Sequence, residues 1–165
     1  MAKRHPSLVL LSQDHHHGLA LALRLRQGDN ALLTDGWTHD RKEQAKHVQG
    51  FYNEELRWHF KAEEDALFPQ MIKHVSASSS LIESLISQHR QLEVLVRRIG
   101  SSSGTQLEES LVSMGQLLEQ HIRSEERELF PLFESTMPSD VAEQIGSKVK
   151  GIHAKQTLQE RAREN

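Results

Sequence analysis

The sequence contains no cysteine among its 165 residues. This excludes disulfides, thiolate metal sites and cysteine nucleophiles together, so any metal must be bound through nitrogen and oxygen. Aromatic residues are also scarce, at 5% of the chain. A β-sandwich normally needs more aromatic and β-branched residues, whereas a helical bundle with charged outer faces is compatible with this composition.

No charge of one sign predominates, because 20 basic and 23 acidic residues are interspersed and the formal net charge is −3. A broad basic surface, which nucleic-acid binding requires, is therefore not expected. No apolar run approaches the ~20 residues of a membrane span, and the first residues lack the small-residue cleavage site of a signal peptide. We expect a cytoplasmic protein with neither nucleic acid nor membrane as a partner, and the sequence identifies no protein partner.

Helix-breaking residues divide the chain into helical blocks. Four long helices are predicted over residues 12–27, with Ser12 as the N-cap, 39–71, 80–100 and 105–133. A shorter fifth helix is predicted to begin at 138–140 and to fray into a polar tail. Because short loops favour antiparallel neighbours, the expected fold is all-α, an antiparallel up-down four-helix bundle with a short extra C-terminal helix. The domain is predicted to be single, 1–165, with its core at about 8–134 and the extra helix and tail at 138–165.

An internal repeat supports this division. Residues 59–69 read HFKAEEDALFP and residues 121–131 read HIRSEERELFP, so histidine, two glutamates, leucine, phenylalanine and proline recur at one constant offset. The second and fourth helices are therefore predicted to be pseudo-symmetric partners, each ended by its Leu-Phe-Pro sequence. The third helix also resembles the first when His15 is set on His89, although Gly18 then faces Leu92.

Histidine is unusually abundant, with 11 copies. Residues four apart share a helix face, so His at i and Glu at i+4 can reach a common point in the core. Three such pairs occur in the predicted helices: His59 with Glu63, His89 with Glu93, and His121 with Glu125.

The apolar positions around His89 indicate that this imidazole faces inward. Positions 82, 85, 92, 96 and 99 are Ile, Leu, Leu, Val and Ile. Burying histidine and glutamate there is costly unless each is paired, and a cation is the cheapest common partner. On the first helix, His15 lies on the better apolar stripe and is favoured as the inward residue, with His16 as the alternative. The remaining histidines, His153 among them, and Glu64, Glu126 and Glu128 are predicted to lie at the surface.

This arrangement resembles the hemerythrin-like family of HHE cation-binding domains over residues 8–134. The resemblance implies a non-haem centre of two iron ions with an oxo or hydroxo bridge. The implied metal ligands are His15, His59, Glu63, His89, Glu93, His121 and Glu125. One iron would take His15 and His59, the other His89, Glu93 and His121, and Glu63 and Glu125 would bridge both. Oxygen-carrying hemerythrins have histidine in place of Glu93 and a five-residue step to an aspartate on the fourth helix, so Glu126 stays an alternative to Glu125.

The donor set also agrees with this metal on chemical grounds. Imidazole and carboxylate together suit iron or manganese, and zinc is a further substitute although structural zinc normally takes four ligands. The resemblance implies binding or sensing of dioxygen, peroxide or nitric oxide rather than a dedicated enzyme. The alternatives are a di-iron peroxidase or oxidase and, further away, a metal-free interaction bundle. As a third anion, Glu93 is expected to favour the ferric state.

Overall fold

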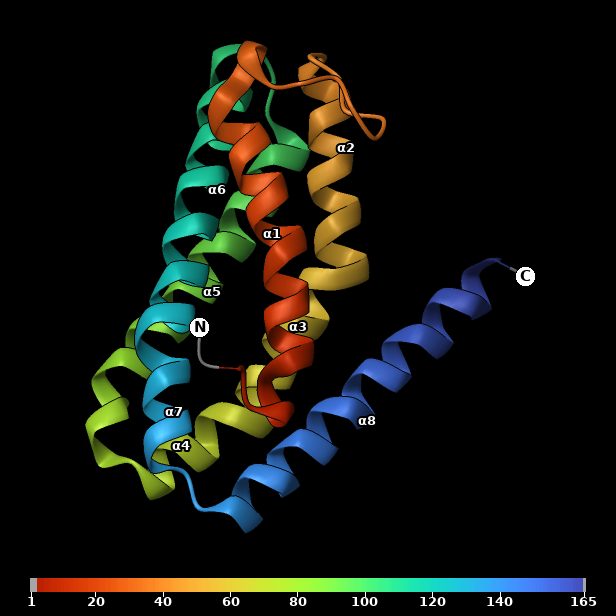
Figure 1. Ribbon diagram of the computed structural model, residues 1–165. Helices are drawn as coiled ribbons and strands as arrows, with labels where there is room; N and C mark the ends of the chain where they lie inside the picture. The colour runs from red at the N-terminus through yellow and green to blue at the C-terminus, as the bar shows by residue number, and fades with distance from the viewer. Residues whose placement is uncertain (1–2, 165) are drawn as a thin grey trace.

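A computed structural model describes residues 3–164, which form helices and contain no strand (Figure 1). Most connections between the helices are short, and the longest covers residues 31–40. The ends of the predicted domain, residues 1–2 and 165, lie outside the described part. The described chain is a helical bundle, as the sequence predicted.

The first helix, α1, spans Val9–Gln27 and follows a 3-10 turn at Pro6–Leu8. It therefore begins earlier than predicted, and Ser12 is inside the helix rather than at its N-cap. Its predicted end is confirmed. Gly28 terminates it with φ +55°, a left-handed conformation that glycine adopts without steric cost.

The second predicted helix runs through five consecutive segments. α2 (Arg41–Phe51), α3 (Arg57–Ala62) and α4 (Phe68–His74) are joined by π-helical turns at Tyr52–Leu56 and Glu63–Leu67. The prediction that Leu-Phe-Pro ends this helix is wrong, since α4 continues past Pro69. The proline has no N–H for the carbonyl one turn earlier, that of Asp65, and the Nζ of Lys148 donates to that oxygen instead at 2.6 Å.

The third and fourth blocks follow the predicted positions closely. α5 spans Ser79–Ser101, and α6 (Gly104–Ser124) continues through a π-helical turn at Glu125–Leu129 into α7 (Phe130–Thr136). Pro131 therefore does not end its helix either. The π-turns at 63–67 and 125–129 occupy the same place in the internal repeat, and such turns are frequent at functional sites.

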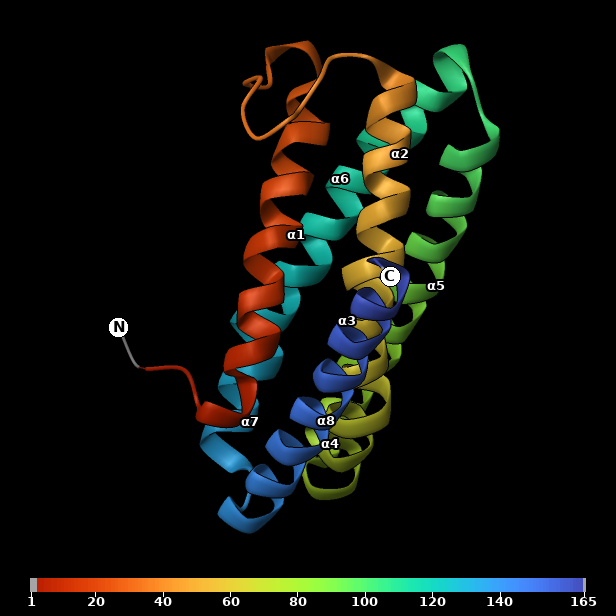
Figure 2. The same cartoon turned by 90° about the vertical axis from the view of Figure 1, so that its right-hand side faces the viewer.

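The C-terminal helix α8 spans Ser139–Glu164, 26 residues, so the prediction of a short helix is wrong. Its N-terminal half buries Val141, Ile145, Val149 and Ile152. Figures 1 and 2 show α8 crossing the bundle obliquely beside α3 and α4, and it contacts α3 and the π-turn at Glu63–Leu67. It is therefore a packed element rather than a fraying tail.

The apolar core consists of two clusters. One lies at the α4, α7 and α8 end and includes Phe68, Phe130 and Phe133; the other lies along α1, α2, α5 and α6 and includes Leu25, Leu92 and Met114. The buried histidines and glutamates of the described chain belong to neither cluster and occur on α1, α3, α5, α6 and the two repeated π-turns. No helix among residues 3–164 is long and apolar enough to cross a membrane.

Glycine sets the close approach of α1 to α6. A Cβ on Gly115 would stand 2.8 Å from the carbonyl oxygen of Ala22 and 2.9 Å from the Cβ of Leu25. Gly115→Ala is therefore expected to lower the free energy of unfolding by about 1–3 kcal/mol, measured by urea denaturation. Gly151→Ala on α8 is the control, because nothing lies within 4 Å of its Cβ, and it should stabilise by about 0.5–1 kcal/mol. Equal shifts in both variants would contradict the packing argument.

Candidate metal centre

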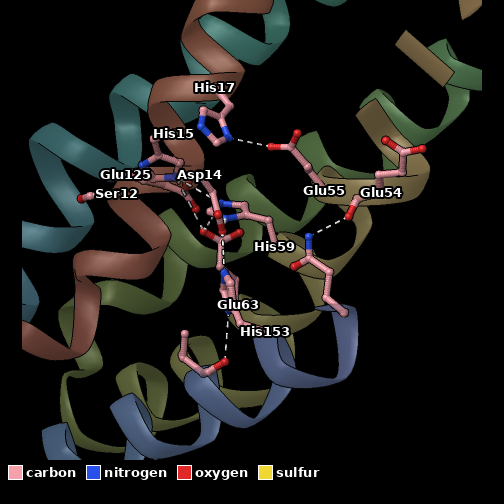
Figure 3. A network of polar contacts seen from close by, with 12 residues as sticks. Ser12, Asp14, His15, His17, Glu54, Glu55, His59, Glu63, Glu125 and His153 are labelled. Atoms are coloured by element: carbon pink, nitrogen blue, oxygen red, sulfur yellow. Dashed lines mark hydrogen bonds and ion pairs between the residues drawn. The ribbon is translucent and has the colours of Figure 1, made fainter. Parts of the chain in front are cut away.

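Six buried side chains from different parts of the chain converge at one place in the bundle. Their ligand atoms form two overlapping groups, each with all atoms within 4.8 Å of one another: His15, His59, Glu63 and Glu125 in one, and Glu63, His89, His121 and Glu125 in the other. Both glutamates belong to both groups. Figure 3 shows His15 and Glu125 meeting His59 and Glu63, the last two from one continuous helical run.

The imidazoles face inward through Nε2. The Nε2 atoms of His15 and His59 are 3.1 Å apart. Those of His89 and His121 are 3.2 Å apart. Each group therefore presents two ring nitrogens to the same small volume.

Glu63 places one carboxylate oxygen toward each pair of histidines. Its Oε1 lies 2.9 Å from His59 Nε2 and its Oε2 lies 3.1 Å from His89 Nε2. Glu125 lies between the pairs as well, since its Oε2 is 3.0 Å from His15 Nε2 and 3.4 Å from His121 Nε2. Each glutamate therefore faces both pairs of histidines, which is the placement that the predicted bridging role requires.

The outer nitrogen of every imidazole has its own acceptor. Nδ1 of His15 lies 2.7 Å from Glu126, Nδ1 of His59 lies 3.0 Å from Asp14, Nδ1 of His89 lies 2.7 Å from Glu64, and Nδ1 of His121 lies 3.0 Å from the amide oxygen of Gln88. Ionised carboxylates only accept hydrogen bonds, so Nδ1 carries the proton and Nε2 is the nitrogen left to bind a metal. Histidine ligands of metal sites are held in this way by outer partners.

The outer carboxylates are themselves fixed by cations or hydroxyls. Glu126 accepts from Arg4 and from Ser12, and Glu64 accepts from Arg90. Asp14 accepts from His153 of α8 at 2.9 Å. Burial by itself would raise the pKa of Asp14, but the hydrogen bonds from His153 and His59 outweigh it and lower the pKa to about 2. These carboxyls are therefore ionised and serve as acceptors.

The two inner carboxyls differ in their affinity for protons. Burial raises the pKa of Glu125 to about 7, and the nearby charge of Glu63 adds to that rise. Burial also opposes ionisation of Glu63, but His59 and His89 outweigh it and hold the pKa of Glu63 well below its ordinary value. Two carboxyls this close do not ionise freely without a cation between them.

The imidazoles respond to the same charges. Burial alone lowers the pKa of a histidine, yet the neighbouring carboxylates outweigh burial and raise the pKa of His15, His59 and His89. Burial and the charge of His89 lower the pKa of His121 well below its ordinary value. Protons and cations therefore compete for the same inner nitrogen and oxygen atoms, so metal binding at this place should depend on pH.

The residues fit a metal pair on one further observation. All four carboxylate oxygens of Glu63 and Glu125 are buried and accept no hydrogen bond. Unpaired buried carboxylates are costly and normally mark a partner such as a metal ion. Nitrogen and oxygen donors without sulfur suit iron or manganese.

The alternatives left open by the sequence separate clearly in space. His15 is inside the first group, whereas His16 is exposed on the outer face of α1. Glu125 belongs to both groups, whereas Glu126 contacts the outer nitrogen of His15. His15 and Glu125, rather than His16 and Glu126, are therefore the members of these two pairs that converge with the other inner side chains.

Glu93 is the predicted ligand that the structure does not bring together with the others. Glu93 belongs to neither group, and its carboxylate accepts from Arg90 at 2.6 Å at the protein surface. The buried side of α5 runs through His89, Leu92 and Val96, and position 93 falls beyond its edge. The expectation that Glu93 favours the ferric state as a third anion therefore loses its structural basis.

Sequence reasoning missed the outer partners. Glu64 and His153 were predicted at the surface, whereas both complete hydrogen-bonded chains to the inner histidines. The repeat held a signal for the carboxylates, because Glu64 and Glu126 each follow a converging glutamate at equivalent positions. Each then accepts from a histidine on a neighbouring helix.

A small cavity lies beside the first group. It is lined by Gly18, Leu56, Ile122 and the histidines His15, His59 and His121, among others, with a volume of about 10 Å³, close to what one water-sized molecule requires. In the alignment of the first and third helices, Leu92 stands where Gly18 stands, and Leu92 is fully buried. Because Gly18 has no side chain, Ile122 packs closely against it at the edge of this cavity.

Together, the helical bundle and the buried histidine and carboxylate groups define the class of metal-binding helical bundles. The model of the hemerythrin HHE cation binding domain matches residues 7–133, and the chain belongs to this family. Comparison with curated proteins and with solved structures gave no match.

Proposed function

We propose that the chain is a non-haem di-iron protein with an antiparallel up-down four-helix arrangement, which reversibly binds or senses dioxygen or a related small ligand such as peroxide or nitric oxide. The observation that supports it most strongly is the inward convergence of four Nε2 atoms on two buried carboxylates that lack hydrogen bonds. A metal-free bundle gives no reason to keep this many unpaired acceptors in its interior.

The geometry divides the donors evenly between two metal positions. His15 and His59 would hold one iron and His89 and His121 the other, while Glu63 and Glu125 would serve both. Iron bound by such donors supplies one-electron chemistry toward dioxygen and its relatives. Each iron would take two histidines and two shared carboxylates, fewer donors than octahedral iron accepts, which leaves room for a small exogenous ligand.

The surrounding residues would select the ligand by size and polarity. The cavity beside His15 and His59 is bordered by Leu56 and Ile122, which are apolar, and admits a molecule of about the size of water. Apolar walls exclude bulk water and so slow the loss or hydrolysis of a reactive bound species.

The first test is metal analysis of the full chain produced with sufficient iron. The proposal expects about two irons per chain, near-ultraviolet absorption of the oxidised protein, and a spectral change when the reduced protein meets dioxygen or nitric oxide without continuous turnover. Zinc as the sole tightly held metal, or no metal at all, would overturn it. Sustained consumption of peroxide would instead favour the peroxidase alternative.

The cavity gives a separate prediction. A Cβ on Gly18 would stand 2.7 Å from Cδ1 of Ile122, which also lines the cavity, so Gly18→Ala is expected to narrow the cavity by its own methyl group or by moving the isoleucine. Azide binding to the iron-loaded protein should weaken about tenfold, equivalent to ~1.4 kcal/mol, while the iron content stays unchanged. Gly50→Ala is the control, because nothing lies within 4 Å of its Cβ. Unchanged azide affinity in Gly18→Ala would place the ligand elsewhere.

A further inference from the structure

The pseudo-symmetry of the centre is broken at one pair of outer residues. The sequence repeats relate His15 to His89 and His59 to His121. In each half, the residue just before the first of the two histidines accepts a hydrogen bond from the second histidine. Asp14 accepts from His59, whereas its counterpart Gln88 accepts from His121. One metal position therefore has a charged outer partner where the other has a neutral amide.

The charged partner is fixed from the C-terminal helix. One oxygen of Asp14, Oδ2, lies 3.0 Å from Nδ1 of His59 and 2.9 Å from Nε2 of His153. The other nitrogen of His153, Nδ1, lies 3.1 Å from the carbonyl oxygen of Val149 in the same helix. Both ring nitrogens face acceptors only, so both carry protons and the ring is held in one orientation. Figure 3 shows His153 reaching from α8 toward Asp14 and His59.

The packing of α8 against the bundle holds His153 in contact with Asp14. Val149 and Ile152, which precede His153, are buried against the bundle, and Gln156 donates to the carbonyl of Glu54 at 2.7 Å. The His153 side chain is 19% exposed. The residue thus lies at a packed interface between α8 and the helices that carry the histidines.

We propose that His153 is a positioning residue for the metal position of His15 and His59, acting through Asp14 and His59. The inference rests on the proposed metal centre. It makes α8 a part of that centre, although the match to the family ends at residue 133. Outer partners of this kind orient a histidine ligand and strengthen its binding to metal.

The other metal position offers a matched comparison. Arg90 binds Glu64, and Glu64 accepts from His89 at 2.7 Å. Arg90 therefore corresponds to His153. Each fixes a carboxylate, Glu64 or Asp14, that accepts from an inner histidine, and neither contacts that histidine itself. Changes at the two cations should affect different metal ions.

The experiment measures metal release from the full chain. The protein is loaded with two equivalents of cobalt(II), mixed with excess EDTA, and followed by visible absorption. His153→Leu should speed the release of one equivalent about tenfold and leave the other unchanged, since loss of an outer partner costs about 10–100-fold in affinity. Arg90→Leu should speed the other equivalent. His153→Gln should restore a rate near wild type, because its amide N–H can donate to the same oxygen.

A double-mutant cycle tests the route through Asp14. In an Asp14→Ala background, His153→Leu should cause no further acceleration. Additive effects, equal acceleration of both equivalents, or acceleration of the same equivalent by His153→Leu and Arg90→Leu would each overturn the inference. Circular dichroism of the metal-free variants verifies folding, and His153→Gln keeps the test decisive if His153→Leu fails to fold. Wild-type protein that takes up neither iron nor cobalt overturns the proposed function itself, whereas normal uptake with an unaffected His153→Leu overturns this inference alone.

Discussion

Glu63→Gln should abolish stable binding of both metal ions. The Glu63 carboxylate directs one oxygen to His59 and the other to His89, so in the proposed centre it would serve both metal positions. An amide offers only one oxygen as a metal ligand and leaves its NH2 group facing the second metal position. Since loss of an outer partner already costs about 10–100-fold in metal affinity, loss of this shared ligand should cost about a hundredfold or more. Metal content after gel filtration and competitive titration against a chelator measure the effect.

Glu93→Gln is the matched control. Both residues are the glutamate of an HxxxE pair, but Glu93 lies outside both groups and contacts Arg90. The variant should retain both metals with little change in affinity. A loss comparable to that of Glu63→Gln would show that Glu93 is a ligand after all and that the observed geometry does not describe the loaded protein.

This pair of residues also shows how far helical spacing predicts a site. The i+4 rule correctly brings Glu63 to His59 and Glu125 to His121, where a π-turn begins at each glutamate. On α5 the helix stays regular from Ser79 to Ser101, and its buried side passes through Leu92 instead of Glu93. The spacing was the same in all three pairs, so the sequence pattern alone could not separate them.

Prolines misled the sequence interpretation for a related reason. Pro69 and Pro131 follow π-turns and stand near the start of α4 and α7, where a missing N–H is tolerated. For Pro69, the carbonyl that loses its usual donor is satisfied by Lys148 from a distant part of the chain. The residues around the Leu-Phe-Pro sequence give no sign of this donor, so the continuation of the helix could not be predicted from them.

The contribution of α8 to the site was the hardest part to predict from the sequence. Val141, Ile145, Val149 and Ile152 do carry a helical apolar spacing that predicts one buried face. The link from His153 to Asp14, however, joins residues 139 positions apart. Such a contact follows from the packing of α8 across the bundle, which no spacing within a single helix encodes.

Glu125→Gln should stabilise the metal-free protein at neutral and higher pH. The folded pKa of Glu125 is about 7, above its ordinary value of 4.5, because the group is buried and close to Glu63. The folded chain therefore holds this proton more tightly than the unfolded chain, and the fold loses stability as pH rises from 4.5 through 7. Glutamine has no proton to lose, so the variant should gain about 2 kcal/mol in free energy of unfolding at pH 8 and little at pH 4.

Urea denaturation of chelator-treated wild type and variant at both pH values measures this gain. Glu128→Gln is the control, because Glu128 is exposed on the same π-turn and should leave stability nearly unchanged at either pH. Addition of iron(II) should reverse the order. Wild type gains stability from any ligand that binds only the folded state, by about 4 kcal/mol at a thousand times the dissociation constant, while the variant lacks the shared carboxylate. Two outcomes would contradict this prediction: a variant that is less stable than wild type without metal, or one that iron(II) stabilises as much as wild type. Either would show that burial of the Glu125 carboxylate does not destabilise the metal-free fold in a way that metal binding offsets.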